Sequence, residues 1–464
     1  MKSKTLLTLT AIVVALGAFI WFFERHEPTS DEAHNRESKI FGALEEEDVL
    51  ALDITNSQGV FTIRREGEGW RLTQPIEADA DQTAVDTAIR GLLGLKIDRA
   101  LPSADVSPEA YGLDTPEATV TLTSQNGEKY TLAVGNPTPL GAKRSVSLDP
   151  KSILLTGGSF FPAIDKGLDD WRSRRVADIR LDQLAALSIQ TENGTIKANA
   201  LGDQWQLHSP INDRADREHL QNVISGLNAL RIEEFVDDGG DEAAMGLVRP
   251  STSVLLVRAD GLPGLSLEFG ATREQGGATQ IACRRNTADV FWVNDRAETP
   301  LGMAPIRWRD PKVLAFDTWD VAALALSDST TSIKLNKEGG LWQFEDGGEV
   351  RGDEVLKRLG VLSNLKAVNF DLVNLGTDEM GRAVITLNGG TSPITCTFFK
   401  PFEAGGNVLV SVSDRATFMS VAPDDAQSII GNLEALRSDE TPGDLPEDSE
   451  SETTDPVKEV KTSD

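Results

Sequence analysis

Short runs of alternating apolar and polar residues, separated by turns, precede a stretch with helical spacing. Residues 49–54 alternate in character, residues 56–59 are typical of a turn, and residues 61–63 and 70–72 resume the alternation. Alternation of this kind predicts strands that bury one face. After Asp81 the apolar residues recur every three or four positions, which predicts an amphipathic helix. Its apolar face is Val85, Ala88, Ile89, Leu92, Leu93 and Leu95.

A further set of strands follows this helix. Gly112 and Pro116 interrupt the helical pattern and predict the entry into a second sheet. The strands of this meander are expected at 118–123, 130–134, 145–148 and 153–155.

The whole pattern occurs three times. Four kinds of position recur: a Trp on an early strand, an Asp at the start of the helix, a Gly after a large apolar residue, and a Trp-Arg pair at the end. They are Trp70, Trp205 and Trp342; Asp81, Asp216 and Asp353; Gly112, Gly246 and Gly381; and, with their arginines, Trp171 and Trp308. A repeat this long is a small domain in tandem. The sequence therefore predicts an α+β protein with three tandem repeats of antiparallel sheet plus helix.

The repeated positions have structural explanations. A Trp at a recurring place on a strand fills the space between sheet and helix, and a sugar-stacking surface is the functional alternative. The Asp can accept hydrogen bonds from free N–H groups at the helix start and complement the helix dipole. The pairs Trp171-Arg172 and Trp308-Arg309 are expected to pack one repeat on the next, with the Arg stacked or paired.

The N-terminal segment has the pattern of a membrane anchor. Residues 1–4 contain two lysines, and residues 5–23 carry no charge and end in aromatic side chains. A helix over 5–23 would span roughly the 30 Å hydrocarbon core. Basic residues before the span and acidic ones after it predict a cytoplasmic stub and an extracytoplasmic remainder. A cleaved signal peptide is the competing interpretation.

The remaining boundaries follow from composition. A polar tether is expected at 24–44. The repeats then occupy 45–178, 179–315 and 316–437. Residues 438–464 are rich in acids and contain almost no large apolar side chain, so this tail is expected to be disordered.

Composition and charge narrow the classes of partner. The 464 residues are 39% hydrophobic and 25% charged, an ordinary globular mixture. The formal net charge of −28 disfavours nucleic acid and anionic lipid headgroups as main partners, because both would be repelled. Solubility is the simplest explanation of this charge. Cys283 and Cys396 fall in different repeats, and each is expected to be a small buried residue on a strand.

The sequence contains no recognisable catalytic, cofactor-binding or metal-binding constellation. Of the four histidines, His208 and His219 lie in the second repeat, where the first repeat has Thr73 and Ala84. A general base that the repeat required would not be replaced by Ala. The acidic run 237–242 lacks the alternating ligand spacing of a calcium loop and is expected to be solvated.

The order of motifs resembles a known family. The membrane segment is followed by Gly69-Trp70-Arg71-Leu72-Thr73-Gln74-Pro75, a helix after Asp81, Tyr111-Gly112-Leu113-Asp114-Thr115-Pro116 and the strand end Val134-Gly135. This combination is similar to domain of unknown function 4340, a family of bacterial envelope proteins. The third repeat departs from the pattern, because it lacks the Pro after Trp342 and the Gly-Leu-x-x-Pro signature. The resemblance implies an association with auxiliary components of gliding-motility-type ABC transporters, and it supplies no catalytic residue.

The sequence therefore predicts a non-enzymatic, single-pass protein of the bacterial inner membrane that faces the periplasm and binds other envelope proteins. The expected partners are the membrane, through the N-terminal helix, and ABC transporter components, with no cofactor and no small-molecule substrate. A module that binds cell-wall glycan or polysaccharide is the alternative, and it requires solvent-exposed Trp70, Trp205 and Trp342. A hydrolase is a third hypothesis, and it requires a pocket with convergent polar groups.

Overall fold

The computed structural model describes residues 38–437, apart from 43, 103–106, 140–141, 150–151, 203, 297, 374–377, 391, 402 and 404. The predicted stub and membrane span (1–4 and 5–23), most of the tether and the acidic tail (438–464) lie outside the described residues. Among the described helices, none is both long and apolar enough to cross a membrane.

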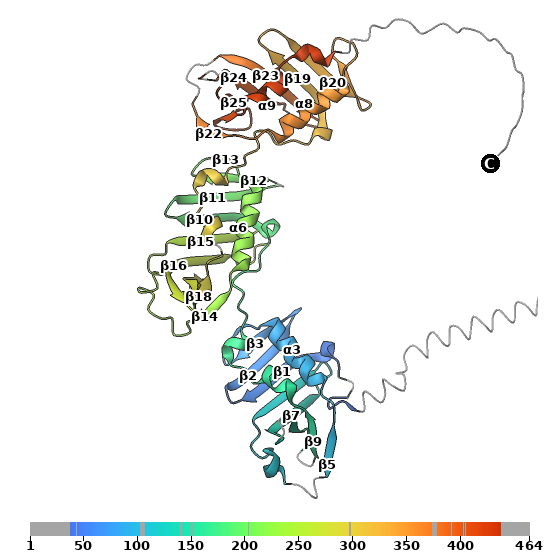
Figure 1. The fold of residues 1–464 in the computed structure, drawn as a ribbon, viewed down its shortest axis with the longest axis vertical. Coiled ribbons are helices and arrows are strands. Elements are labelled where there is room, and N and C mark those ends of the chain that lie inside the picture. Colours follow the sequence, from blue (N-terminus) through green and yellow to red (C-terminus); the bar gives the residue numbers. More distant parts are fainter. Residues whose placement is uncertain are drawn as a thin grey trace, which may run out of the picture.

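The described residues form three antiparallel sheets, which follow one another along the chain and in space (Figure 1). We call each sheet with its helices a unit. Unit one is 38–171, unit two is 177–308 and unit three is 314–437; linker one (172–176) and linker two (309–313) connect them. Antiparallel sheets with few helices make the fold α+β.

Unit one has the strand order β4-β3-β2-β1-β6-β7-β8-β9-β5, with α3 (Gln82–Leu93) packed against the sheet. Its strands are β1 (Val49–Asn56), β2 (Gly59–Glu66), β3 (Gly69–Gln74), β4 (Ala78–Asp79), β5 (Arg99–Pro102), β6 (Ala118–Ser124), β7 (Lys129–Pro137), β8 (Lys143–Ser147) and β9 (Ser152–Gly157). The short helices α4 (Phe161–Ile164) and α5 (Leu168–Trp171) lead to linker one.

Unit two has the corresponding order β13-β12-β11-β10-β15-β16-β17-β18-β14, and α6 (Arg217–Ala229) takes the place of α3. Its strands are β10 (Leu184–Thr191), β11 (Gly194–Leu201), β12 (Gln204–Ser209), β13 (Asp213–Arg214), β14 (Ile232–Phe235), β15 (Thr252–Arg258), β16 (Leu265–Gln275), β17 (Ala278–Arg285) and β18 (Asp289–Asn294). The short helix α7 (Glu298–Leu301) follows β18.

Unit three has the order β21-β20-β19-β23-β24-β25-β26-β22 and packs both α8 (Gly352–Asn364) and α9 (Pro423–Ile430) into its core. Its strands are β19 (Val321–Asp328), β20 (Ser332–Glu338), β21 (Leu341–Phe344), β22 (Asn369–Leu372), β23 (Glu379–Leu387), β24 (Ile394–Phe399), β25 (Val408–Val412) and β26 (Phe418–Val421).

Each unit contains one continuous sheet, so the prediction of a second sheet after the helix is wrong. In unit one, β1 pairs with β2 on one side and with β6 on the other. β10 and β19 occupy the same central place in their units. The chain crosses from one half of the sheet to the other through the helix, and this long-range pairing leaves no mark on the local pattern.

The amphipathic pattern correctly predicts which residues form the core. The predicted apolar face of α3 is buried against the strands of unit one, as is Trp70. Units two and three have hydrophobic cores of their own, which contain Trp205 and Trp342. The two cysteines are fully buried on β17 and β24, as expected.

Two of the three repeated Asp residues cap helices. Asp81 accepts a hydrogen bond from the Ala84 N–H at 2.8 Å, and Asp216 accepts from the N–H groups of Glu218 and His219. Asp353 instead lies inside the first turn of α8, where Arg351 occupies the cap position. The prediction that Asp353 caps the helix is therefore wrong, because the loop after Trp342 is shorter than its counterparts.

The repeated Gly also has the same role in only two of the three units. Gly112 and Gly246 adopt left-handed backbone conformations, with φ of 66° and 70°, and each ends a short helical turn. Gly381 has a different role, because it lies in β23, where a Cβ would overlap Ile430 of α9. Its assignment to the same repeat position is wrong. The strand-end Gly135 is explained by a close approach, since a Cβ there would overlap the Tyr111 carbonyl oxygen.

Candidate functional site

The end of each unit returns to the start of its own helix. A backbone N–H at that start donates to the carbonyl of the returning segment: Asp81 to Trp171 at 2.8 Å, Asp216 to Trp308 at 2.8 Å, and Arg351 to Leu436 at 3.0 Å. Leu436-Arg437 is therefore the third counterpart of the two Trp-Arg pairs. The segment between two units, together with the side chains that contact it, is called a junction below.

The repeated tryptophans are core residues. Trp70, Trp205 and Trp342 are between 4% and 8% exposed, and Trp171 and Trp308 are fully buried. The indole N–H of Trp70 donates to Asp86 at 3.0 Å. The sugar-stacking surface required all three early rings to be exposed, and their burial removes it.

At junction one, Arg172 connects units one and two. Its guanidinium donates two hydrogen bonds to the carboxylate of Asp237, at 2.7 and 3.0 Å. The guanidinium carbon also lies 3.8 Å from the centre of the Phe235 ring, a stacked arrangement. The Asp237 side chain is 56% exposed, so water reaches this ion pair. Arg172 is thus both stacked and paired, as predicted.

Arg285 of unit two binds backbone carbonyl groups at linker one. Arg285 donates to the carbonyls of Arg175 and Val176 at 3.3 and 3.4 Å, and pairs with Asp289 in its own hairpin. On the unit one side, Asp79 contacts Arg71 of the same unit at 3.5 Å. These contacts leave the facing edges of the two sheets joined mainly through the linker.

A cleft of about 890 Å³ opens beside linker one. Its walls come from the edge of unit one, including Ala78, from Arg175 in the linker, and from Leu256, Arg285 and Phe291 of unit two. Both apolar and charged groups line it, and its arginines have acidic neighbours. The cleft shows that the two units are not closely packed on this side.

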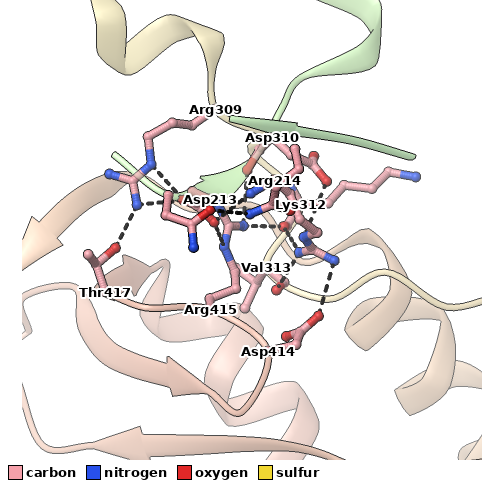
Figure 2. Close-up of polar contacts among 11 residues, drawn as sticks. Asp213, Arg214, Arg309, Asp310, Lys312, Val313, Asp414, Arg415 and Thr417 are labelled. Carbon is pink, nitrogen blue, oxygen red and sulfur yellow. Dashed lines mark hydrogen bonds and ion pairs between the residues drawn. The ribbon is translucent and has the colours of Figure 1, made fainter. Parts of the chain in front are cut away.

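At junction two the corresponding arginine, Arg309, is buried (Figure 2). It donates to the Asp213 carboxylate at 2.7 Å and to the Thr417 hydroxyl at 2.6 Å. Its guanidinium carbon lies 4.4 Å from the centre of the Phe370 ring. Asp213 belongs to unit two, whereas Thr417 and Phe370 belong to unit three, so Arg309 joins the two units. It too is stacked and paired, as predicted.

Arg415, in the loop between β25 and β26, binds the same carboxylate. Its Nε and Nη2 atoms donate to the two carboxylate oxygens of Asp213 at 2.9 and 2.8 Å (Figure 2). Its Nη1 atom donates to the carbonyls of Asp310 and Lys312 in linker two, at 3.0 and 2.7 Å. The side chains of Asp213, Arg309 and Arg415 are 1%, 2% and 0% exposed.

Arg214 adds a third guanidinium to this cluster. It donates to the carbonyls of Lys312 and Val313 at 2.7 and 2.9 Å. The carboxylates of Asp310 and Asp414 lie 3.8 and 3.7 Å from its nitrogens. Linker two is therefore bound by arginines of both neighbouring units, Arg214 from one and Arg415 from the other.

Burial and neighbouring charges shift the pKa values of the groups in this cluster. Burial raises the pKa of the Asp213 carboxyl, but the hydrogen bonds and charges of Arg415 and Arg309 outweigh burial and hold that pKa below its usual value. Burial, reinforced by the charge of Arg415, lowers the pKa of Arg214. Burial also raises the pKa of Asp310. Asp213 thus stays anionic among three guanidinium groups, an arrangement suited to holding units together.

The acidic run 237–242 is occupied by internal contacts. Asp237 pairs with Arg172, and Glu242 pairs with Arg284 at 2.7 Å. Asp238 and Asp241 accept hydrogen bonds from backbone N–H groups within the loop. In the part of the chain that the structure describes, no three His, Cys, Asp or Glu side chains are grouped to hold a metal ion.

A family model extends the repeat to other proteins. The model described as Domain of unknown function (DUF4340) matches residues 70–250 and again residues 205–380, together more than half of the chain. The chain belongs to the DUF4340 family. Each match runs across one junction of this DUF4340 chain, the first across linker one and the second across linker two. No curated protein matches the sequence.

Sequence reasoning found part of this site. It identified Arg172 and Arg309 from their place beside a repeated Trp. It missed Asp213 and Arg415, which no motif connects, since they are 202 positions apart. The available signal was a difference between copies, because the first repeat has Ala78 where the second has Asp213.

Proposed function

We propose that this DUF4340 chain is a non-enzymatic interaction protein of the bacterial envelope, anchored in the inner membrane by residues 5–23. Lys2 and Lys4 before that segment and acidic residues after it support an orientation with the three units in the periplasm. Its partners are other envelope proteins, and the proposal includes components of an ABC transporter. The transporter link rests on the family resemblance.

The observation that carries this proposal is the serial arrangement of the units. Each unit has its own core, and the polar clusters at junctions one and two connect the units into an elongated body (Figure 1). Such a body presents a long surface to partners along its length, as tandem-repeat proteins do. The excess of acidic over basic residues, 73 against 45, favours proteins over nucleic acid as the bound molecules.

Two measurements in cells test the proposal. A reporter fused after Arg437 should be active outside the cytoplasm, because the anchor is expected to export everything beyond residue 23. Photo-crosslinkers at exposed positions such as Lys129 and Lys357, followed by purification from membranes and mass spectrometry, should recover transporter subunits.

The matched control is the same chain without residues 2–23, which keeps all three units but lacks the anchor. Reporter activity confined to the cytoplasm would contradict the topology. Equal recovery of every crosslinked protein with the anchored and unanchored chains would contradict a specific envelope partner.

A further inference from the structure

We propose that units two and three form one rigid body and that unit one turns relative to them about linker one. This inference concerns the chain itself and holds whatever partner the protein binds. It rests on three differences between junctions that otherwise share one backbone arrangement.

The first difference is the buried ion cluster of junction two. Rotation of unit three about linker two would pull Arg415 away from Asp213. Both side chains are almost completely buried, so their charges would be left unpaired in a site that water does not reach. Removing one partner from a buried ion pair is strongly unfavourable, because the other charge loses its compensation. The cluster therefore resists any bend at this junction.

The second difference lies at the edge strand. Backbone β-bridges pair Arg172 with Ala80 and Arg309 with Ala215, so the edge strands of units one and two are equivalent. In this alignment Ala78 of unit one corresponds to Asp213 of unit two. The methyl group of Ala78 can form no ion pair with unit two. The cleft of about 890 Å³ lies on this face of junction one, whereas the ion cluster occupies the corresponding face of junction two, whose own cleft of about 790 Å³ lies beside Trp205 and Phe316.

The third difference is in the linkers. The linker carbonyl that accepts from the start of the following edge segment is that of Arg174 in linker one, which accepts from Ile232, and that of Pro311 in linker two, which accepts from Ala367. Proline fixes φ near −65° and removes one rotational freedom, whereas Arg174 keeps it. The ion pair that remains at junction one joins Arg172, which is 11% exposed, to Asp237, which is 56% exposed, and Asp169 lies 3.3 Å from the same guanidinium, so separation of Asp237 leaves Arg172 a second carboxylate.

Distances between spin labels test this inference on the full chain. One doubly labelled protein carries Lys129→Cys and Glu274→Cys, which report on units one and two. A second carries Glu274→Cys and Lys357→Cys, which report on units two and three. The three positions are exposed, and the native Cys283 and Cys396 are fully buried and should take no label. We expect a broad distance distribution for the first pair and a single narrow peak for the second.

Variants at the ion cluster make the test specific. Asp213→Asn and, separately, Arg415→Gln should broaden the distribution between units two and three, with loss of the narrow peak. Asp237→Asn is the matched control at junction one and should leave that peak unchanged. Circular dichroism confirms that each variant keeps its sheets; Arg415→Gln serves if Asp213→Asn fails to fold, and Thr417→Val, which removes one partner of Arg309, serves if both fail.

The reverse change completes the experiment. Ala78→Asp places a carboxylate at the counterpart of Asp213, in a cleft that Arg175 and Arg285 also line, and it should narrow the distribution between units one and two. Equal widths for the two pairs in the unchanged protein would overturn the inference. So would a folded Arg415→Gln protein that keeps the narrow peak.

Discussion

The two junctions share a backbone and differ in side chains. In both, an Arg beside a buried Trp stacks on a Phe of the next unit, and the linker adds a bridge to each neighbouring sheet. At junction one the carboxylate partner is exposed Asp237, whereas at junction two it is buried Asp213, which a second arginine also binds. A tandem protein can therefore set the stiffness of each junction through a few polar residues, without a change in the fold of its units.

The largest expected loss of stability follows from removal of a junction tryptophan, and it should be equal at the two junctions. Trp171→Ala and Trp308→Ala each remove a fully buried indole, and each should lower the free energy of unfolding of its unit by about 3–5 kcal/mol through the cavity that is left. Urea unfolding of the two variants measures this. A loss of unfolding free energy in only one of the two variants would show that the two tryptophans do not support their junctions in the same way.

A second pair of variants should separate the junctions. Asp213→Ala leaves Arg309 and Arg415 buried without their carboxylate and should cost about 3–5 kcal/mol. Asp237→Ala removes an exposed carboxylate and leaves Arg172 with Asp169, 3.3 Å away, so it should cost about 0–1 kcal/mol. Thermal and urea unfolding of both variants test the difference. Similar losses for both variants would contradict the contrast between a buried and an exposed joint.

A smaller difference in stability is expected for the Asp residues at the starts of α3, α6 and α8. Asp81→Ala and Asp216→Ala should each cost about 1 kcal/mol, because each carboxylate caps a helix. Asp353→Ala should cost only about 0.3 kcal/mol, since this carboxylate lies in the first turn, where it acts on the helix dipole and forms an exposed ion pair with Arg351 at 3.5 Å. Equilibrium unfolding with matched variants tests the order, and a larger loss for Asp353 would refute the assignment of Arg351 to the cap position.

Acidification should weaken unit two before unit one. The His219 and Trp308 rings meet edge to face, with their centres 4.4 Å apart. Burial lowers the pKa of the His219 imidazole. The unfolded chain therefore takes up a proton below the ordinary pKa of 6.5 while the folded unit stays neutral, and stability falls by at most about 1.4 kcal/mol for each pH unit below it. Unit one has Ala84 at this place.

The pH dependence of unfolding between pH 7 and pH 5 measures this effect, with His219→Gln as the control. The variant should lose the part of the slope that comes from the imidazole. An unchanged slope would mean that other groups account for it.

A separate loss is expected at lower pH. The Asp213 carboxyl has a lowered pKa, so its contribution is complete above the usual Asp value of 3.8 and disappears as the pH falls through the lowered value. The labelled pair that spans units two and three should therefore broaden only in strong acid. Broadening already at pH 5 would indicate that another group holds this joint.

Local features of the fold were predictable from sequence, and long-range ones were not. Alternation and helical spacing identified the strands, the buried face of α3 and the core role of Trp70, because each depends on neighbouring residues. The pairing of β1 with β6 joins two halves across a helix, so the expected second sheet was wrong. The constant offset that predicted Asp353 as a cap failed because a loop changed length, which a fixed spacing cannot detect.

The same division applies to the candidate site. Arg172 and Arg309 could be assigned to the junctions because each follows a repeated Trp at a repeat boundary. Asp213 and Arg415 meet only in three dimensions, and a carboxylate on an edge strand looks like a solvated residue in the sequence. The substitution of Asp213 for Ala78 gains its meaning once the two edges are superimposed.

The linkers have one more consequence, which concerns unpaired sheet edges. The outermost strands β4 and β14 face linker one, where the Ser173 N–H donates to Asp79 and the Ile232 N–H donates to Arg174. A single peptide segment thus covers an edge of two sheets at once and occupies backbone groups that would otherwise invite pairing with another chain. A unit excised from its neighbours would lose this cover, so the tandem arrangement itself protects the protein against edge-to-edge aggregation.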